Sequence, residues 1–390
     1  MTMHVPSATL VFLAAIFGLL VVPRALQRFR LPAPLTCFVL GIVTAVLFKD
    51  QLEGRALKVM ATLGISSLFL FAGLEVDMVE IRRQLPRLAG HLGIRGLFLF
   101  GFGWVAMRYL HMSWQPAALL ALGLLTPSTG FILDTLQHSG LKESEQNEVA
   151  MDAIAGEITA LVVLFLISQA SSIQTLAVSS TVLLLLIVIT PFFYLALKKY
   201  VVPYAPGSEF SLLLMVGIIC AVITNQLGVH YLIGAFVAGL VAGLMRKRMT
   251  TMASPENLHA VRLFASFFVP FYFFREGLEV PTGALVVKAL LYGVAFAAVV
   301  LPIRLAKGWL QVRYMSGRSI RGGFRVSLAL LPTLIFTLVI AGILRDMFHI
   351  NDALYGGLLV YAAIATILPS FLLPRVTPRV LAAIATEAGA

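Results

Sequence analysis

Charge is what this 390-residue sequence has least of. Only 12% of its residues are Asp, Glu, Lys or Arg, against about a quarter in an average soluble domain. Hydrophobic residues make up 59% of the chain, and the mean hydropathy is +0.95. This composition excludes an ordinary soluble domain and predicts a chain that crosses a membrane several times.

Acidic residues are scarcer than basic ones, 18 against 29, which gives a net charge of +11. The basic residues form short clusters between apolar runs, as orientation signals do, so nucleic acid is excluded as a partner. Cysteine is also rare. Cys37 and Cys220 both lie in apolar runs and are expected to be small core residues. The histidines are scattered without metal-ligand spacing, so neither a transition-metal site nor a cofactor is predicted.

Apolar runs separated by Pro, Gly and charged residues predict about thirteen membrane spans and no soluble regulatory domain. The expected fold class is an all-α polytopic membrane protein. The predicted spans begin near Ala8, Pro34, Val59, Gly90, Gln115, Glu148, Leu176, Phe210, Tyr231, Leu263, Gly283, Gly322 and Ala353.

Lys and Arg are concentrated in every second loop between these spans, where Arg82, Arg87 and Arg95 are examples. Loops rich in Lys and Arg stay in the cytoplasm. We therefore expect an inner (plasma) membrane protein with its N-terminus outside and its C-terminus in the cytoplasm. No basic residue precedes the first apolar run, so we expect it to remain as a helix instead of being cleaved as a signal peptide.

Two of the predicted spans are each interrupted by a proline: the fifth by Pro127 and the twelfth by Pro332. Proline removes a backbone hydrogen bond, and neighbouring Ser and Thr can satisfy the freed groups or offer oxygens to a hard cation. The two spans are seven apart in order, so they cross the membrane in opposite directions. Broken helices in two inverted halves indicate a transporter's central site. The residues of this predicted broken-helix site are Thr126, Pro127, Ser128, Thr129, Pro332 and Thr333.

Two carboxylates, Asp152 and Glu157, enter an apolar run that continues to Ile167. A helix that starts near Glu148 puts Glu157 roughly 13 to 15 Å deep, near the middle of a bilayer core of roughly 30 Å. A carboxylate at that depth needs a proton, a cation or a water-filled cavity. These residues are the predicted cation and proton ligands. The alternative is an acid that a buried Arg neutralises for structural reasons.

Three stretches resemble signatures of the monovalent cation:proton antiporter-2 family, which includes Kef-type membrane domains. They are Phe71–Asp77 (FAGLEVD), Gly234–Leu240 (GAFVAGL) and Phe267–Leu278 (FFVPFYFFREGL). Together with the break at Thr126–Gly130, they occur in the family's order and span nearly the whole chain.

The resemblance implies a fold of about thirteen helices with inverted repeats, in which a core domain rocks against a dimerisation domain. The core helices would come in part from residues 59–170 and 261–373, and the scaffold helices in part from 8–48 and 176–245. It also implies a homodimer that exchanges Na⁺ or K⁺ for H⁺.

The sequence departs from the family's pattern at its charged positions. The family's carboxylate pair falls on Gly156 and Glu157, so one member has no side chain. The family's basic residue corresponds to Arg304, with Lys307 as the alternative. Arg275 interrupts an aromatic helix, either as a charge partner of Glu157 or as an Arg that extends to the membrane interface.

The sequence therefore predicts a monovalent cation/proton antiporter, not an enzyme, in which Glu157 alternately holds H⁺ and the cation. Because Gly156 cannot titrate, one proton is expected to exchange for one cation. Two alternatives stay open: a transporter of the same fold with an anionic or organic substrate, and a membrane receptor or subunit that does not transport.

Overall fold

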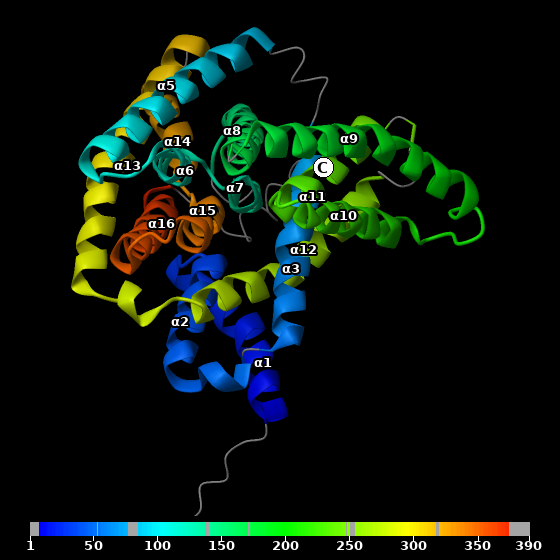
Figure 1. Ribbon diagram of the computed structural model, residues 1–390, viewed down its shortest axis with the longest axis horizontal. Coiled ribbons are helices and arrows are strands. Elements are labelled where there is room, and N and C mark those ends of the chain that lie inside the picture. The colour runs from blue at the N-terminus through cyan, green and yellow to red at the C-terminus, as the bar shows by residue number, and fades with distance from the viewer. Residues whose placement is uncertain are drawn as a thin grey trace, which may run out of the picture. The chain divides into compact units, whose positions relative to one another are not determined.

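The structure is a computed structural model that describes residues 8–52, 54–76, 85–136, 140–170, 172–246, 248–249, 254–316 and 320–373. Within these ranges the regular secondary structure is helical (Figure 1), which confirms the predicted all-α class. Asp77 of the first family-like stretch and the C-terminal tail lie outside the described residues.

The chain divides into two compact units. Unit 1 comprises Met1–Leu85 and Leu161–Val280, and unit 2 comprises Pro86–Ala160 and Pro281–Ala390. Three parts of the expected core stretches thus group with unit 1: residues 59–85, 161–170 and 261–280. The assignment of helices to a moving core and a dimerising scaffold stays a prediction.

Unit 1 is built from long apolar helices in which small residues permit close packing. A Cβ atom added to Gly73 or Gly239 would collide with the backbone of the facing helix, so α3 and α11 approach as closely as glycine allows. The helices of this unit are α1 (Ala8–Leu26), α2 (Ala33–Leu52), α3 (Arg55–Leu74), α9 (Ile173–Tyr200), α10 (Glu209–Gln226), α11 (Tyr231–Leu244) and α12 (Pro255–Leu278), with the 3₁₀ turn η1 (Gln27–Phe29) after α1.

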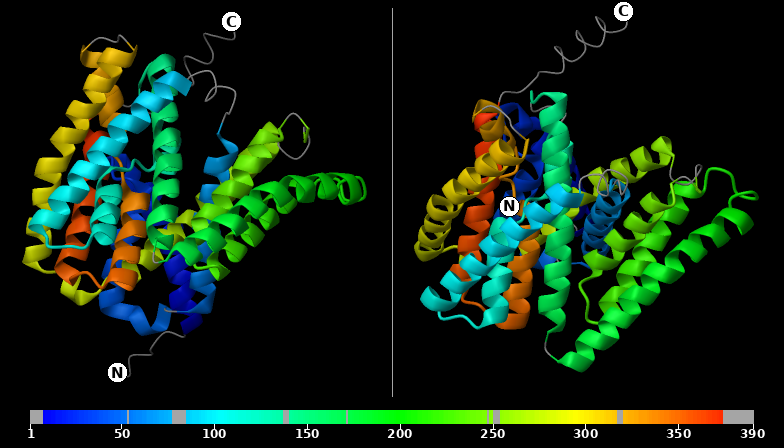
Figure 2. Two further views of the ribbon diagram at one scale, coloured as in Figure 1. Left: turned by 45° about the horizontal axis from the view of Figure 1, so that its top comes forward. Right: turned by 90° about the horizontal axis from the view of Figure 1, so that it is seen from above.

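Unit 2 contains the interrupted helices and most of the helix that carries the carboxylates. Within it, α13 and α14 lie side by side (Figure 2), and α15 packs on both α6 and α16. Its elements are α5 (Leu85–Tyr109), α6 (Trp114–Leu125), α7 (Thr129–Leu136), α8 (Glu143–Gln169), η2 (Thr282–Ala284), α13 (Val287–Ser316), α14 (Ile320–Ala329), α15 (Leu334–Phe348) and α16 (Asp352–Leu372).

Eight helices of the described chain are long and apolar enough to cross a membrane, or nine if the bent pair α14 and α15 counts as one span. Shorter apolar helices cover Ala33–Val46 and Tyr231–Leu244. The chain is therefore a multi-pass membrane protein. The number of thirteen spans stays a prediction.

Both predicted helix breaks are present. Residues Thr126–Ser128 separate α6 from α7, and Leu330–Thr333 separate α14 from α15, with a bend of 45° between α14 and α15. Proline explains both positions, because Pro127 and Pro332 lack the N–H that a continuous helix would use.

Candidate functional site

The two breaks meet through direct hydrogen bonds. The backbone N–H of Ser128 donates to the carbonyl of Pro332 at 2.8 Å, and Ser128 Oγ accepts from the N–H of Ile335 at 2.9 Å. Thr337 Oγ1 donates to the carbonyl of Gly123 at 2.8 Å. The polar backbone groups at the breaks are thus satisfied in part across the two breaks, as non-helical backbone at membrane depth requires.

Three buried threonines lie where the two helix breaks meet, a region that we call the crossing. Thr126 has extended backbone, with φ −83° and ψ 123°, and ends α6. Thr129 begins α7 and donates its hydroxyl to the carbonyl of Ala153 on α8 at 2.9 Å, which connects the first break to the carboxylate helix. Thr333 Oγ1 has no hydrogen-bond partner within the described ranges. A role for these oxygens in binding an ion stays a prediction.

Glu157 lies near the middle of α8 and is only 4% exposed. Its side chain interacts with Thr129, whereas its Oε2 atom has no hydrogen-bond partner among the residues that the structure describes. A buried carboxylate oxygen without a donor is costly and is characteristic of sites that take up an ion, a proton or water. Helix α8 begins at Glu143, five residues before the predicted start near Glu148.

Asp152, the second predicted carboxylate, forms an ion pair. Its Oδ1 lies 2.8 Å from Arg95 Nη2, with both side chains largely buried, and the same nitrogen donates to the Asp152 carbonyl at 2.7 Å. Arg95 comes from α5 and lines the same cavity as Asp152. A structural pairing of an acid with a buried Arg, which the sequence left open for Glu157, is found at Asp152.

Arg304 of α13 binds the second break. It donates to the carbonyls of Leu330 at 2.7 Å and Leu331 at 2.9 Å, and to the hydroxyl of Tyr361 at 3.1 Å. Tyr361 in turn donates to the carbonyl of Leu124, in the last turn of α6, at 2.6 Å. No ion pair between Arg304 and Glu157 occurs in the described structure, because the guanidinium neutralises carbonyl dipoles instead.

The other two predicted charge partners have different surroundings. Lys307 lies one turn beyond Arg304, lines the cavities next to Arg95 and Asp152, and places its ammonium 5.7 Å from the ring of Phe98. Arg275 belongs to unit 1, where it pairs with Glu279 and lies 4.0 Å from Glu276. A role for either residue toward Glu157 stays a prediction.

Two small polar cavities adjoin the crossing. The smaller cavity, of about 20 Å³, is lined in part by Thr126, Gly156, Thr159 and Lys307. The other, of about 40 Å³, is lined in part by Pro127, Asp152, Arg304 and Gln311. Arg95 lines both cavities. Each is large enough for at least one water molecule. Each cavity therefore has room for a water molecule or a small ion.

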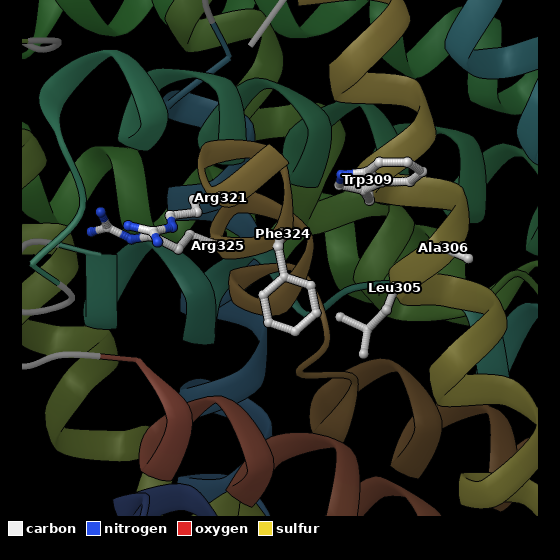
Figure 3. Close-up of a pocket in the computed structure, with 6 residues that line it drawn as sticks. All are labelled: Leu305, Ala306, Trp309, Arg321, Phe324 and Arg325. Carbon is white, nitrogen blue, oxygen red and sulfur yellow. The ribbon is translucent and has the colours of Figure 1, made fainter. Parts of the chain in front are cut away.

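A much larger cavity of about 570 Å³ lies between α13 and α14, lined by Leu305, Ala306, Trp309, Arg321, Phe324 and Arg325 (Figure 3). A cavity of this size is a usual candidate for a small-molecule site. This one is lined by none of the predicted site residues, and its Phe324 is 46% exposed, as on a lipid-facing surface. The small polar cavities are the better candidates.

Arg95 and Tyr361 were not predicted from the sequence to lie at the site. Arg95 was expected in a cytoplasmic loop, although it lies five residues after the start of the span predicted near Gly90 and precedes an unbroken apolar run. The available signal was Gly156, because a position without a side chain next to a buried acid leaves space for a side chain from elsewhere. For Tyr361, the signal was a hydroxyl in an otherwise apolar helix, which needs a hydrogen-bond partner.

Two crossed broken helices beside a buried carboxylate that has no ion-pair partner among the described residues indicate a secondary transporter that couples to small ions. The family model "Sodium/hydrogen exchanger, transmembrane" matches residues 11–378, so the chain belongs to the sodium/hydrogen exchanger family. The predicted monovalent cation/proton antiport is confirmed at the level of this family.

Individual relatives agree with this assignment. The chain is 23% identical over 376 residues to the "Probable Na(+)/H(+) antiporter 3" of Methanocaldococcus jannaschii, which covers 92% of this chain and 94% of that protein. It is 22% identical over 373 residues to a Na(+)/H(+) antiporter of Enterococcus hirae, covering 91% and 94%. Among solved structures, the sodium proton antiporter MjNhaP1 of Methanocaldococcus jannaschii matches with a TM-score of 0.64 at 14% identity, covering 94% and 95%. The last match establishes the fold.

Proposed function

We propose that this chain exchanges Na⁺ for H⁺ by alternating access and that Glu157 binds the two in turn. The observation that carries the proposal is the Glu157 carboxylate, which is 4% exposed, has an oxygen without a donor and lies beside the broken helices. A desolvated carboxylate is stable when it holds either a proton or a cation, but not when it is empty. Exchange follows, because one bound species must replace the other.

The breaks supply the rest of the ion's surroundings. Hard cations prefer carboxylate, hydroxyl and carbonyl oxygens. The proposal assigns these roles to Glu157 and to the oxygens of Thr126, Ser128, Thr129 and Thr333, with Pro127 and Pro332 keeping the chain open. Arg304 stabilises the carbonyl end of α14 and so fixes the shape of the second break.

The proposal also covers the choice of cation, the oligomeric state, the orientation in the membrane and the division into core and scaffold. K⁺ can replace Na⁺ as the cation, the working form is a homodimer in the lipid of the inner membrane, and the N-terminus lies outside with the C-terminus in the cytoplasm. Residues 59–170 and 261–373 contribute the moving core, and 8–48 and 176–245 the scaffold. Assignment to the antiporter-2 branch rests on the three family-like stretches alone.

One observation favours a second candidate, a small anionic substrate. The cavity of about 40 Å³ is lined by three basic residues, Arg95, Arg304 and Lys307, and by one carboxylate, Asp152. Glu157 would then carry the proton that accompanies the anion.

Proteoliposomes that contain a pH-sensitive dye distinguish these candidates. Purified protein is challenged with Na⁺, K⁺ and Li⁺ as gluconate salts, and then with chloride, nitrate and bicarbonate at constant cation concentration. The proposal predicts proton movement that depends on Na⁺ and not on the anion. Proton movement that follows the anion would favour the second candidate, and none under any condition would favour a protein that does not transport.

A further inference from the structure

Arg95 fills the space that Gly156 leaves beside Glu157. A Cβ atom added to Gly156 would collide with Nη1 of Arg95, so the guanidinium packs directly against the glycine backbone. Arg95 is 9% exposed, and its Nε atom is buried without a hydrogen-bond partner among the described residues. A charged group in this position is costly unless its charge is balanced nearby.

Asp152 balances that charge. The contact of 2.8 Å to Oδ1 and the second bond of 2.7 Å to the Asp152 carbonyl use the same Arg95 nitrogen, Nη2, so the guanidinium is fixed both to the side chain and to the backbone of α8. Charge-assisted bonds of this kind are stronger and better defined in geometry than neutral ones. The pair thus holds Arg95 in one position between Asp152 and Gly156.

We infer that Arg95 sets the charge stoichiometry of exchange by keeping Asp152 permanently paired, so that Glu157 is the one carboxylate of this cluster that cycles. Arg95 acts here as a positioning residue that works through Asp152. It is an internal cation that never leaves, and it makes Asp152 unavailable to Na⁺ and H⁺. Asp152 otherwise has what an exchanging carboxylate needs, because it lines a polar cavity with Pro127 and Arg304.

Other charged groups of the described chain lie near Asp152. Lys307 lines the same cavity and acts electrostatically on Asp152, and Arg304 also lines this cavity. Arg304 already binds the carbonyls of Leu330 and Leu331. The inference assigns the pairing to Arg95 because Arg95 makes the contact of 2.8 Å and is bound to the Asp152 backbone as well.

This inference rests on the proposed exchange at Glu157. The experiment is therefore designed so that a failure of exchange at Glu157 and a failure of the role of Arg95 give different results. Wild-type protein in proteoliposomes is given opposing Na⁺ and pH gradients in a fixed K⁺ gradient, and the gradient ratio at which net proton movement stops is measured with and without valinomycin. Any exchange of K⁺ itself is then the same in both measurements, and only the potential differs. One-for-one exchange moves no net charge, so the stopping point of the wild type should not depend on the potential. The Arg95→Gln variant frees Asp152 to bind a second proton, and its stopping point should move with the potential.

Three further variants test whether the effect comes from the loss of the positive charge beside Asp152. Arg95→Lys keeps the positive charge and should retain the wild-type behaviour, and Arg95→Gln combined with Asp152→Asn should restore it. Arg325→Gln is the matched control, because it removes another guanidinium that lies near a buried carboxylate of α8, 3.7 Å from Glu145. It should leave the stopping point independent of the potential.

The outcomes distinguish the two proposals. If the wild type shows no exchange, the function proposed for Glu157 is wrong. If the wild type exchanges but its stopping point already depends on the potential, or if Arg95→Gln remains independent of it, exchange at Glu157 stands and the role of Arg95 is overturned. A potential dependence in Arg325→Gln equal to that in Arg95→Gln would also overturn it.

Discussion

Ser128 and Pro332, 204 positions apart in the chain, are joined by a hydrogen bond of 2.8 Å from the Ser128 N–H to the Pro332 carbonyl. Each break thus supplies partners that the other lacks, and Ser128 contributes a second one through its hydroxyl. The two breaks therefore depend on each other, and a change in one of them alters the other.

Ser128→Ala tests this dependence. The substitution leaves the buried N–H of Ile335 without its acceptor, which costs about 1–3 kcal/mol of the free energy of unfolding. We expect a lower melting temperature in detergent and slower exchange per folded molecule. Ser266→Ala is the control, because Ser266 is exposed and its hydroxyl binds only a carbonyl of its own helix. Equal effects of the two substitutions would contradict the account.

Pro127→Ala and Pro332→Ala test whether the breaks position the ion site. Alanine permits a continuous helix, so each variant should lose more transport than folded protein. The measurement is the initial rate of Na⁺-dependent proton movement divided by the amount of monodisperse protein. Pro191→Ala, in the unbroken helix α9, serves as the control. Parallel losses of folded protein and rate in the two break variants would indicate ordinary helix kinks.

Tyr361→Phe tests the link between Arg304 and the first break. The variant keeps the ring but removes the hydroxyl that donates to Leu124 and accepts from Arg304. The buried Leu124 carbonyl then lacks this donor, and we expect a destabilisation of about 1–3 kcal/mol with impaired exchange. Thermal unfolding and transport are compared with those of Tyr292→Phe, a half-buried tyrosine near Lys288 on α13. A fully active, equally stable Tyr361→Phe variant would exclude a role for this link.

Much of this architecture could be predicted from the sequence, because it depends on local chemistry. Pro127 and Pro332 break helices wherever they fall in an apolar run, and Glu157 stands out as an acid in such a run. Fold class and both breaks follow from such signals.

The pairings could not be predicted, because they join distant parts of the chain. Arg95 and Asp152 are 57 positions apart, and nothing local to either indicates the other. Their separation of five residues places Asp152 and Glu157 about 140° apart around a helix, so the two acids face different neighbours. Which neighbour Asp152 meets depends on the packing of α5 against α8, which sequence periodicity does not specify.

Glu157→Asp tests whether the carboxylate binds the cation directly. The shorter side chain withdraws the carboxylate by one methylene, which changes the distances on which ion selectivity depends. We expect partial activity with an altered preference among Na⁺, Li⁺ and K⁺, measured as the half-maximal concentration for each ion. An unchanged ion preference would argue against direct ligation by Glu157.

The most direct test of the central claim is proton movement driven by Na⁺ in proteoliposomes that contain Glu157→Gln. The amide keeps the volume of the side chain but can neither release a proton nor balance a cation. The account predicts a folded, monodisperse variant without exchange, while Glu256→Gln, at the exposed start of α12, exchanges like the wild type. Exchange by Glu157→Gln at the wild-type rate would contradict it.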